Sequence, residues 1–269
     1  MAKKAHKEMS FMEHLEELRW VLVRCSLATV IMAFATYLVN DFLFNSVIFG
    51  PTKAEFVTYR FFCDASKYLG IAENICITDL DFKIQNTSME GQINTFIWIC
   101  ITAGFILAFP YIIYQFWNFI SPALYEKERK SAKAFIIVSS LLFFLGVLFG
   151  YFVIIPMTIN FVSTFQISTA VVNEFNLESY ISMIKSSVLV SGLFFELPVI
   201  IYFLTKLGLI TVAFLRKYRR YAIVIVLIIA AIVTPPDVVS QVTVSIPMLL
   251  VFEASVIIAA VVEKRRLKA

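Results

Sequence analysis

The chain has 269 residues and a formal net charge of +4, and 60% of its residues are hydrophobic while only 16% are charged. A soluble domain of this length has no interior large enough for so much apolar surface, so the composition excludes an ordinary soluble protein and favours a polytopic helical membrane protein. Each span needs roughly 20 apolar residues, because the hydrocarbon core is about 30 Å thick and a helix rises about 1.5 Å per residue.

Apolar runs along the chain predict six transmembrane helices in an all-α integral membrane protein, which we treat as one domain over residues 1–269. Residues 1–19 are expected to form an amphipathic cytoplasmic N-terminus, and residues 40–91 a long extracytoplasmic loop. A turn with two prolines follows the short fifth run, so spans five and six are predicted to be a short, tight antiparallel pair. The spans are placed at Trp20–Val39, Gln92–Phe116, Ala134–Ile155, Tyr180–Leu204, Tyr221–Thr234 and Val242–Val262.

Basic residues are concentrated on one side of the predicted membrane. The N-terminal segment through Arg24, the segments 114–134 and 205–220 and the C-terminal tail hold 18 of the 23 Lys and Arg residues. The positive-inside rule therefore predicts that both termini are cytoplasmic. These basic residues are scattered over four short segments, which argues against nucleic-acid binding and fits contact with anionic lipid.

Four cysteines and two histidines give no metal-site pattern, and no cofactor motif is present. Cys25 and Cys100 lie in apolar spans and are expected to be inert packing residues. Cys63 and Cys76 lie in the outer segment and can pair if that side is oxidising, but spacing alone leaves a disulfide and two free thiols equally open.

Two acids lie inside predicted spans. Glu196 is about ten residues from Lys206 and Glu253 is ten from Glu263, so each lies about 15 Å from the cytoplasmic end of its helix. Intramembrane acids are functional candidates, although a protonated acid bonded to a neighbouring helix is the simpler interpretation. Pro198 is expected to loosen the helix beside Glu196. These acids therefore allow two alternative functions, a secondary transporter that uses Glu196 and Glu253 as proton relays, and an intramembrane protease that uses paired carboxylates.

Near the N-terminus, Met12–Arg19 predicts a short amphipathic helix just before the first span. Glu13 and Glu17 share one face of this helix, although the surrounding cytoplasmic segments are basic. A second segment, Trp117–Arg129, again sets acids among bases, and local ion pairs are the simplest interpretation of it. The alternative that we favour is a receptor for a cationic partner from the cytoplasmic side.

Several segments in this order resemble the TatC family, the multispanning subunit of the twin-arginine protein translocase. The resemblance implies a concave, cup-like bundle in the bacterial inner membrane, and a receptor rather than an enzyme. It also implies export of folded proteins, driven by a proton gradient, in a hetero-oligomer with several copies. The segments that carry it are His14–Arg19, Phe119–Arg129, Phe195–Pro198, Thr234–Gln241 and Ile246–Met248.

The resemblance also implies roles for single residues and partners. The partners are signal peptides with consecutive arginines and single-span subunits of the TatA and TatB type. The outer segment, residues 53–90, is longer than expected for the family. The residues implied to bind the signal peptide are Glu17, Glu128, Arg19, Leu18 and Phe119. Glu196 is implied to be the polar residue inside the cup, and Thr234 and Gln241 are implied to dock the single-span subunits. Pro51, Pro198 and Asp237 are implied to have structural roles.

Carboxylates suit this implied role on physical grounds. A guanidinium group pairs with a carboxylate through two parallel charge-assisted hydrogen bonds, which a lysine ammonium does not reproduce. Two separated acids, Glu17 and Glu128, are therefore predicted to read two adjacent arginines. Nearby basic residues would repel a badly placed cation and sharpen the selection.

Overall fold

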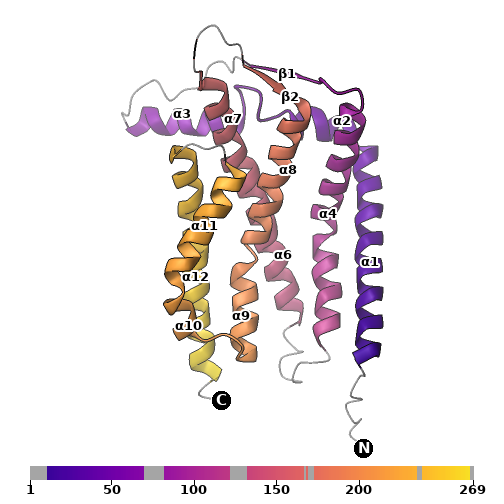
Figure 1. The fold of residues 1–269 in the computed structure, drawn as a ribbon, viewed down its shortest axis with the longest axis vertical. Helices are drawn as coiled ribbons and strands as arrows, with labels where there is room; N and C mark the ends of the chain where they lie inside the picture. Colours follow the sequence, from indigo (N-terminus) through magenta and orange to yellow (C-terminus); the bar gives the residue numbers. More distant parts are fainter. Residues whose placement is uncertain are drawn as a thin grey trace, which may run out of the picture. The chain divides into compact units, whose positions relative to one another are not determined.

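The structure is a computed structural model that describes residues 11–69, 82–121, 132–166, 168, 173–234 and 238–266. Helices dominate it, and each of the six predicted apolar runs falls on helical residues (Figure 1). The helices that contain these runs are α1 (Phe11–Leu38), α4 (Gly91–Ile120), α6 (Ala132–Phe149), π-helix η4 (Gly150–Ile154), α7 (Ile155–Thr164), α8 (Leu177–Phe194), α9 (Leu197–Leu207), α11 (Arg219–Val233) and α12 (Val238–Arg266).

Shorter elements connect these helices. The predicted amphipathic stretch before the first span is not a separate helix, because no helix-breaking residue follows Arg19 and α1 runs unbroken through it. The short elements are α2 (Asn40–Phe42), η1 (Leu43–Ile48), α3 (Val57–Leu69), β1 (Lys83–Gln85), β2 (Glu174–Asn176) and α10 (Val212–Lys217).

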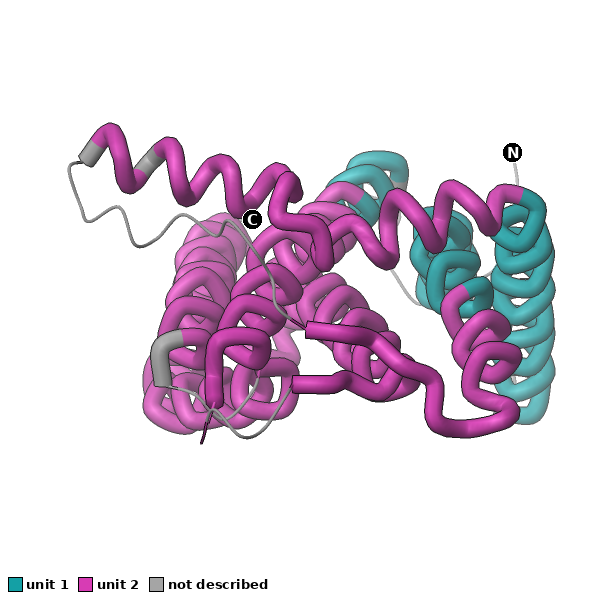
Figure 2. The backbone as a smooth tube through the Cα atoms, turned by 90° about the horizontal axis from the view of Figure 1, so that it is seen from above, with its two compact units in different colours: residues 1–38, 100–140 teal, residues 39–99, 141–269 magenta. Residues whose placement is uncertain are grey.

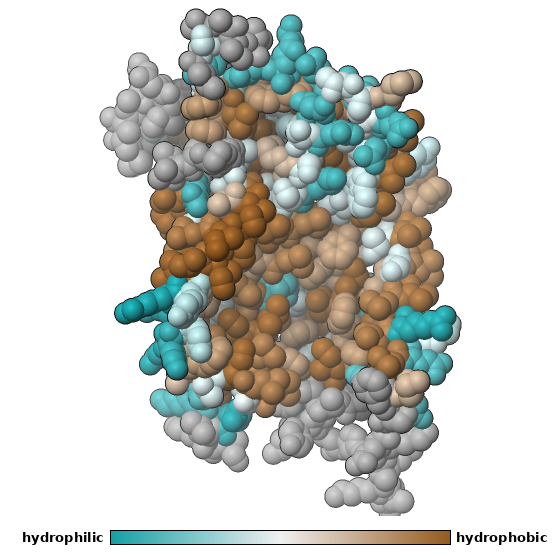
Figure 3. All heavy atoms as spheres, viewed as in Figure 1, coloured by the Kyte–Doolittle hydropathy of each residue, from teal (hydrophilic) through white to brown (hydrophobic). Residues whose placement is uncertain are grey.

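Among the described residues, five helical stretches are long and apolar enough to cross a membrane. The remaining run, the fifth, corresponds to α11, whose 15 residues span only about 22 Å, as the sequence predicted for a short span. The prediction that span six is also short is wrong, because α12 continues as one helix of 29 residues from Val238 to Arg266. Large apolar side chains on these helices are exposed, among them Ile31, Leu145 and Ile232, each more than half accessible. Hydrophobic residues cover much of the helical surface in Figure 3, which suits a surface that faces lipid.

A small parallel sheet was not predicted from the sequence. Strands β1 and β2 pair in register, with Lys83 opposite Glu174 and Gln85 opposite Asn176. Three residues are too few to show the alternating pattern of a strand, so this pairing leaves no signal in the sequence.

The helices group into two compact units, residues 1–38 with 100–140 and residues 39–99 with 141–269 (Figure 2). In unit 1, α1 packs closely on α4. A Cβ atom on Gly104 would lie 2.5 Å from the backbone nitrogen of Ala33, so only glycine permits this approach. The hydroxyl of Thr36 donates a hydrogen bond to the carbonyl oxygen of Cys100 at 3.2 Å, which ties the far end of α1 to α4.

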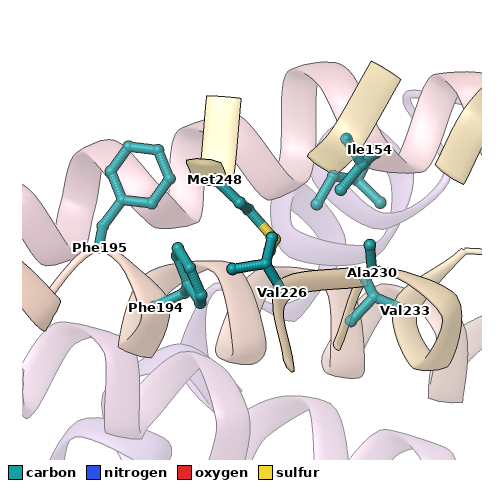
Figure 4. Close-up of a cluster of buried hydrophobic side chains, with 8 residues drawn as sticks. Ile154, Phe194, Phe195, Val226, Ala230, Val233 and Met248 are labelled. Atoms are coloured by element: carbon teal, nitrogen blue, oxygen red, sulfur yellow. The ribbon is translucent and has the colours of Figure 1, made fainter. Parts of the chain in front are cut away.

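Unit 2 has its own apolar core where η4, α8, α11 and α12 meet. Ile154, Phe194, Val226 and Met248 are buried there (Figure 4). The glycine pair of the third span, Gly146 and Gly150, approaches α8 so closely that a Cβ on either would collide with its backbone or Ser191. The pair therefore marks a close helix contact within the chain.

The fourth predicted span is broken in the middle. Helix α8 ends at Phe194 and α9 begins at Leu197, with Pro198 in its first turn. The carbonyl oxygen of Glu196 accepts hydrogen bonds from the amides of Val199 and Ile200, so Glu196 begins the second helix. The expected loosening of the helix at Pro198 is confirmed, because proline has no amide hydrogen to continue the α8 ladder.

Candidate functional site

An open pocket of about 470 Å³ lies in unit 1, between the first turns of α1 and the last turns of α4. On α1 its residues recur every three or four positions, so one face of this helix lines the pocket. The lining residues are Glu13, Glu16, Glu17, Trp20, Val21 and Arg24 from α1, and Gln115, Asn118 and Phe119 from α4.

Charge in this acidic pocket is unbalanced. Among the residues that the structure describes, three glutamates line it and Arg24 is the single cation. The Oε2 atom of Glu17 is buried and accepts no hydrogen bond from the residues that the structure describes. A buried carboxylate oxygen without a partner is costly, so the pocket favours a ligand that brings hydrogen-bond donors and positive charge.

An aromatic contact fixes the two helices at the pocket. The ring of His14 stacks on that of Phe119, with centroids 4.3 Å apart and planes inclined by 17°. Below the pocket, Val21 and Cys25 of α1 pack against Ala108 and Ile112 of α4. Glu17 is therefore held on a packed helix pair, and a site on rigid elements keeps its geometry better than one on a loop.

A second open groove, of about 460 Å³, continues along the same helix pair. Arg24 lines both the pocket and this groove, which is otherwise almost entirely apolar. Together they form a trough with acids at one end and apolar side chains at the other. The apolar groove is lined by Arg24, Leu27, Ala28, Ile31, Met32, Leu107, Ala108, Pro110 and Tyr111.

The predicted signal-peptide residues are only partly brought together. Glu17 and Phe119 line the acidic pocket, whereas Leu18 and Arg19 are not among its lining residues. Glu128 lies outside the described residues. Sequence reasoning missed Trp20, Arg24, Gln115 and Asn118; the recurring three- and four-residue spacing from Glu13 to Arg24 was the one available signal for the α1 side.

The two intramembrane acids have different surroundings. Glu196 is buried, with 6% of its surface exposed, at the break between α8 and α9. Glu253 of α12 accepts hydrogen bonds from both the Nε and a terminal nitrogen of Arg219. Glu253 is thus engaged in a two-point ion pair that joins α12 to the start of α11, which favours a structural role for this acid.

The predicted outer turn is only partly described. The Thr234 hydroxyl donates to the carbonyl oxygen of Ala230 at 2.9 Å, and the Gln241 amide donates to that of Leu227 at 3.2 Å. Both side chains thus bind the backbone of α11, while Asp237 lies outside the described residues.

Near the first outer segment, Pro51 is fully buried and its carbonyl oxygen accepts a hydrogen bond from the Tyr59 hydroxyl. Cys63 is disulfide-bonded, whereas Cys25 and Cys100 are free. Cys76, the partner that the sequence suggested, lies outside the described residues. No cluster of three potential metal ligands occurs in the part of the chain that the structure describes.

Comparison with known proteins gives a consistent result. A family model for the Sec-independent protein translocase protein (TatC) matches residues 13–247. The TatC protein of Blattabacterium sp. subsp. Periplaneta americana (strain BPLAN) is 42% identical over 265 residues, covering 98% of this chain and 100% of that protein. TatCy of Bacillus subtilis (strain 168) is 32% identical over 259 residues, covering 96% of this chain and 92% of that protein.

A solved structure has the same fold. The crystal structure of the twin arginine translocase receptor TatC superimposes with a TM-score of 0.72 at 31% identity, covering 93% of this chain and 99% of that one.

Proposed function

This chain belongs to the TatC family of Sec-independent protein translocase proteins, and from that premise we propose that its acidic pocket binds the paired arginines of signal peptides on folded precursor proteins. The observation that carries the proposal is the buried Oε2 atom of Glu17, which has no hydrogen-bond partner among the described residues. A guanidinium group supplies two donors in the geometry that a carboxylate accepts. Glu128 is proposed as the second acid, reading the second arginine.

The trough also suits the rest of such a peptide. A secretory signal continues from its basic segment into an apolar segment of about 7 to 15 residues. Ile31 lies 14 residues beyond Glu17 on α1, or about 21 Å along the helix, which accommodates an apolar segment of that length. We propose that the arginines occupy the acidic end and that the apolar segment lies along Leu27 and Ile31. Arg24, where the acidic pocket meets the apolar groove, would repel a misplaced arginine and so fix the position of the signal peptide along the trough.

The remaining parts of the role follow from the charge asymmetry and the family. We propose a multi-pass protein of the bacterial inner membrane with six spans, α11 being the short fifth, and with both termini in the cytoplasm. The asymmetry of Lys and Arg supports this orientation, which exposes the acidic pocket to the side from which precursors arrive. Transport would use the proton gradient.

Partner subunits are the last element of the proposal. We propose that single-span subunits of the TatA and TatB type dock at the turn between α11 and α12, in a hetero-oligomer with several copies. The bonds of Thr234 and Gln241 to the α11 backbone support a fixed shape for this turn. Asp237 is proposed to stabilise the same turn.

A binding measurement tests the central claim. The full-length protein in lipid nanodiscs is titrated with a fluorescent signal peptide that carries an Arg-Arg pair, and in parallel with the same peptide carrying Lys-Lys. We expect clearly tighter binding of the Arg-Arg peptide, because lysine does not form the bidentate pair. Equal affinity for the two peptides would contradict arginine recognition by this pocket.

A further inference from the structure

Helix α3 lies crosswise to the long helices of unit 2 and along the edge of that unit (Figures 1 and 2). It belongs to the outer segment, residues 53–90, which was expected to be longer than in the family. Its residues divide into three sectors around the helix axis, and each sector has a different character.

The first sector is buried against the rest of unit 2. The Tyr59 hydroxyl donates to the carbonyl oxygens of Pro51 at 3.0 Å and Pro156 at 3.4 Å, and the Thr58 hydroxyl donates to that of Phe152 at 2.7 Å. The bonds to Phe152 and Pro156 fix the start of α3 to η4 and α7, and the bond to Pro51 ties it to the segment that precedes α3. The orientation of the helix about its own axis is therefore set, and so are the directions of the other two sectors.

The second sector is apolar and exposed. Val57, Phe61 and Tyr68 have 66%, 68% and 92% of their surfaces exposed, and Phe62 has 39%. At about 100° per residue Val57, Phe61 and Tyr68 fall within a sector of about 40°, whereas Phe62 lies beyond the buried Thr58, at the edge of the buried sector. Three exposed apolar or aromatic side chains along one line of a 13-residue helix form a contiguous surface, which in water would be a liability.

The third sector carries the charges. Arg60, Asp64 and Lys67 are all exposed, and Arg60 lies 3.8 Å from the Glu55 carboxylate. At the same angular spacing, Arg60 and Lys67 lie about 100° and 120° around the helix from Phe61. A helix with an apolar, aromatic side and a basic side has the composition of a segment that lies in the plane of a membrane interface.

The level of α3 along the unit agrees with that composition. Phe152 and Pro156, which α3 contacts, lie inside the candidate span Lys133–Thr164. They precede the end of this span by 12 and 8 residues, so α3 lies roughly 12–18 Å below the outer end of α7. The 32-residue span is about 48 Å long, roughly 18 Å more than the hydrocarbon core, so the level of α3 is compatible with the membrane interface.

We infer that α3 is an interfacial anchor, which rests its apolar sector on the lipid of the leaflet nearest to β1 and β2 and turns its charged sector to water. Phe61 and Tyr68 occupy the boundary between headgroups and acyl chains, where aromatic side chains are enriched. The bonds of Thr58 to Phe152 and of Tyr59 to Pro156 transmit this anchoring to η4 and α7.

Depth-dependent quenching of tryptophan fluorescence tests the inference. A background of the full chain with Trp20→Phe, Trp98→Phe and Trp117→Phe receives either Phe61→Trp or, as the matched control on the charged sector, Lys67→Trp. Each is reconstituted into vesicles of phosphatidylcholine and phosphatidylglycerol. We expect lipids brominated near the headgroup end of their chains to quench position 61 several-fold more than position 67, and iodide to show the reverse preference.

Two results would overturn the inference. If iodide quenches both positions equally, the apolar sector faces water. If neither iodide nor brominated lipid quenches position 61, protein covers this sector, as a second copy or a partner subunit would. Tyr68→Trp in the same background repeats the measurement two turns along the helix, so the outcome does not depend on a single site.

Discussion

Replacement of Glu17 by glutamine should weaken binding of the arginine pair while leaving the unliganded protein at least as stable. The substitution keeps the shape of the side chain and removes its charge. A charge-assisted hydrogen bond to a partly shielded carboxylate contributes about 1.5–3 kcal/mol. At 1.4 kcal/mol per tenfold change, this loss corresponds to about a 10- to 140-fold higher Kd for the Arg-Arg peptide.

Stability should respond in the opposite direction. The Oε2 atom of Glu17 is buried without a hydrogen-bond partner among the described residues, so its charge is a cost to the unliganded fold. The Tm of the Glu17→Gln variant, measured without peptide, should therefore equal or exceed that of the parent. A residue that served the fold alone would give the reverse result, a lower Tm with unchanged peptide binding.

Glu16 provides the matched control, because it lines the same pocket but its side chain is exposed. Exposed ion pairs contribute about 0–1 kcal/mol, so Glu16→Gln should raise the Kd by no more than about fivefold. Both variants remove one negative charge and are compared by titration in the same nanodiscs at one salt concentration. Equal losses in the two variants would mean that peptides respond only to net charge, and would refute a specific role for Glu17.

Three further outcomes are expected in unit 2. Gly146→Leu should prevent close packing against Ser191 and lower the Tm by several degrees, and Gly146→Ala should lower the Tm by less. A Tm that is unchanged in the Gly146→Leu variant would contradict the close approach of the two helices. Arg219→Ala alone should destabilise the protein more than Arg219→Ala combined with Glu253→Ala, because the single variant leaves the Glu253 charge unpaired. The Tm of the two variants, measured by thermal unfolding, tests this order. Reduction of the Cys63 disulfide should lower the Tm of the purified protein, as a scan with and without dithiothreitol will test.

Hydropathy predicted most of the helical fold, because a membrane span leaves an unambiguous stretch of sequence. The boundaries of the first span were less accurate. The apolar run begins at Trp20, but α1 begins at Phe11, since the polar turns before the run continue the same helix. Glu13, Glu16 and Glu17 are thus rigidly joined to the first span, because they lie on the same continuous helix. Hydropathy does not report this continuity, although it holds the acids in place at the pocket.

Half of the acidic pocket also escaped prediction. Glu13 and Glu17 were identified from their place beside a basic membrane face, but Gln115 and Asn118 lie at the far end of α4, about 100 residues away. Their role depends on how α1 packs against α4, which Gly104 permits by its lack of a side chain. Pairings between distant segments are fixed by three-dimensional contacts that a single sequence does not encode in any local pattern.

Glu253 shows why depth along a helix does not by itself assign a function to an acid. Its depth was estimated from its distance to Glu263 along the helix, and Arg219 was assigned separately to the basic segment 205–220. The amide of Val212, at the start of α10, instead donates to the Glu263 carboxylate at 2.7 Å, and Arg219 binds Glu253 ten residues further along α12. The segment from Val212 to Arg219 therefore runs along α12 from the level of Glu263 to that of Glu253, and Arg219, the first residue of α11, delivers its guanidinium group to the acid. This also explains how α11 can be short, because the segment that precedes it, with α10, already contacts the C-terminal part of α12.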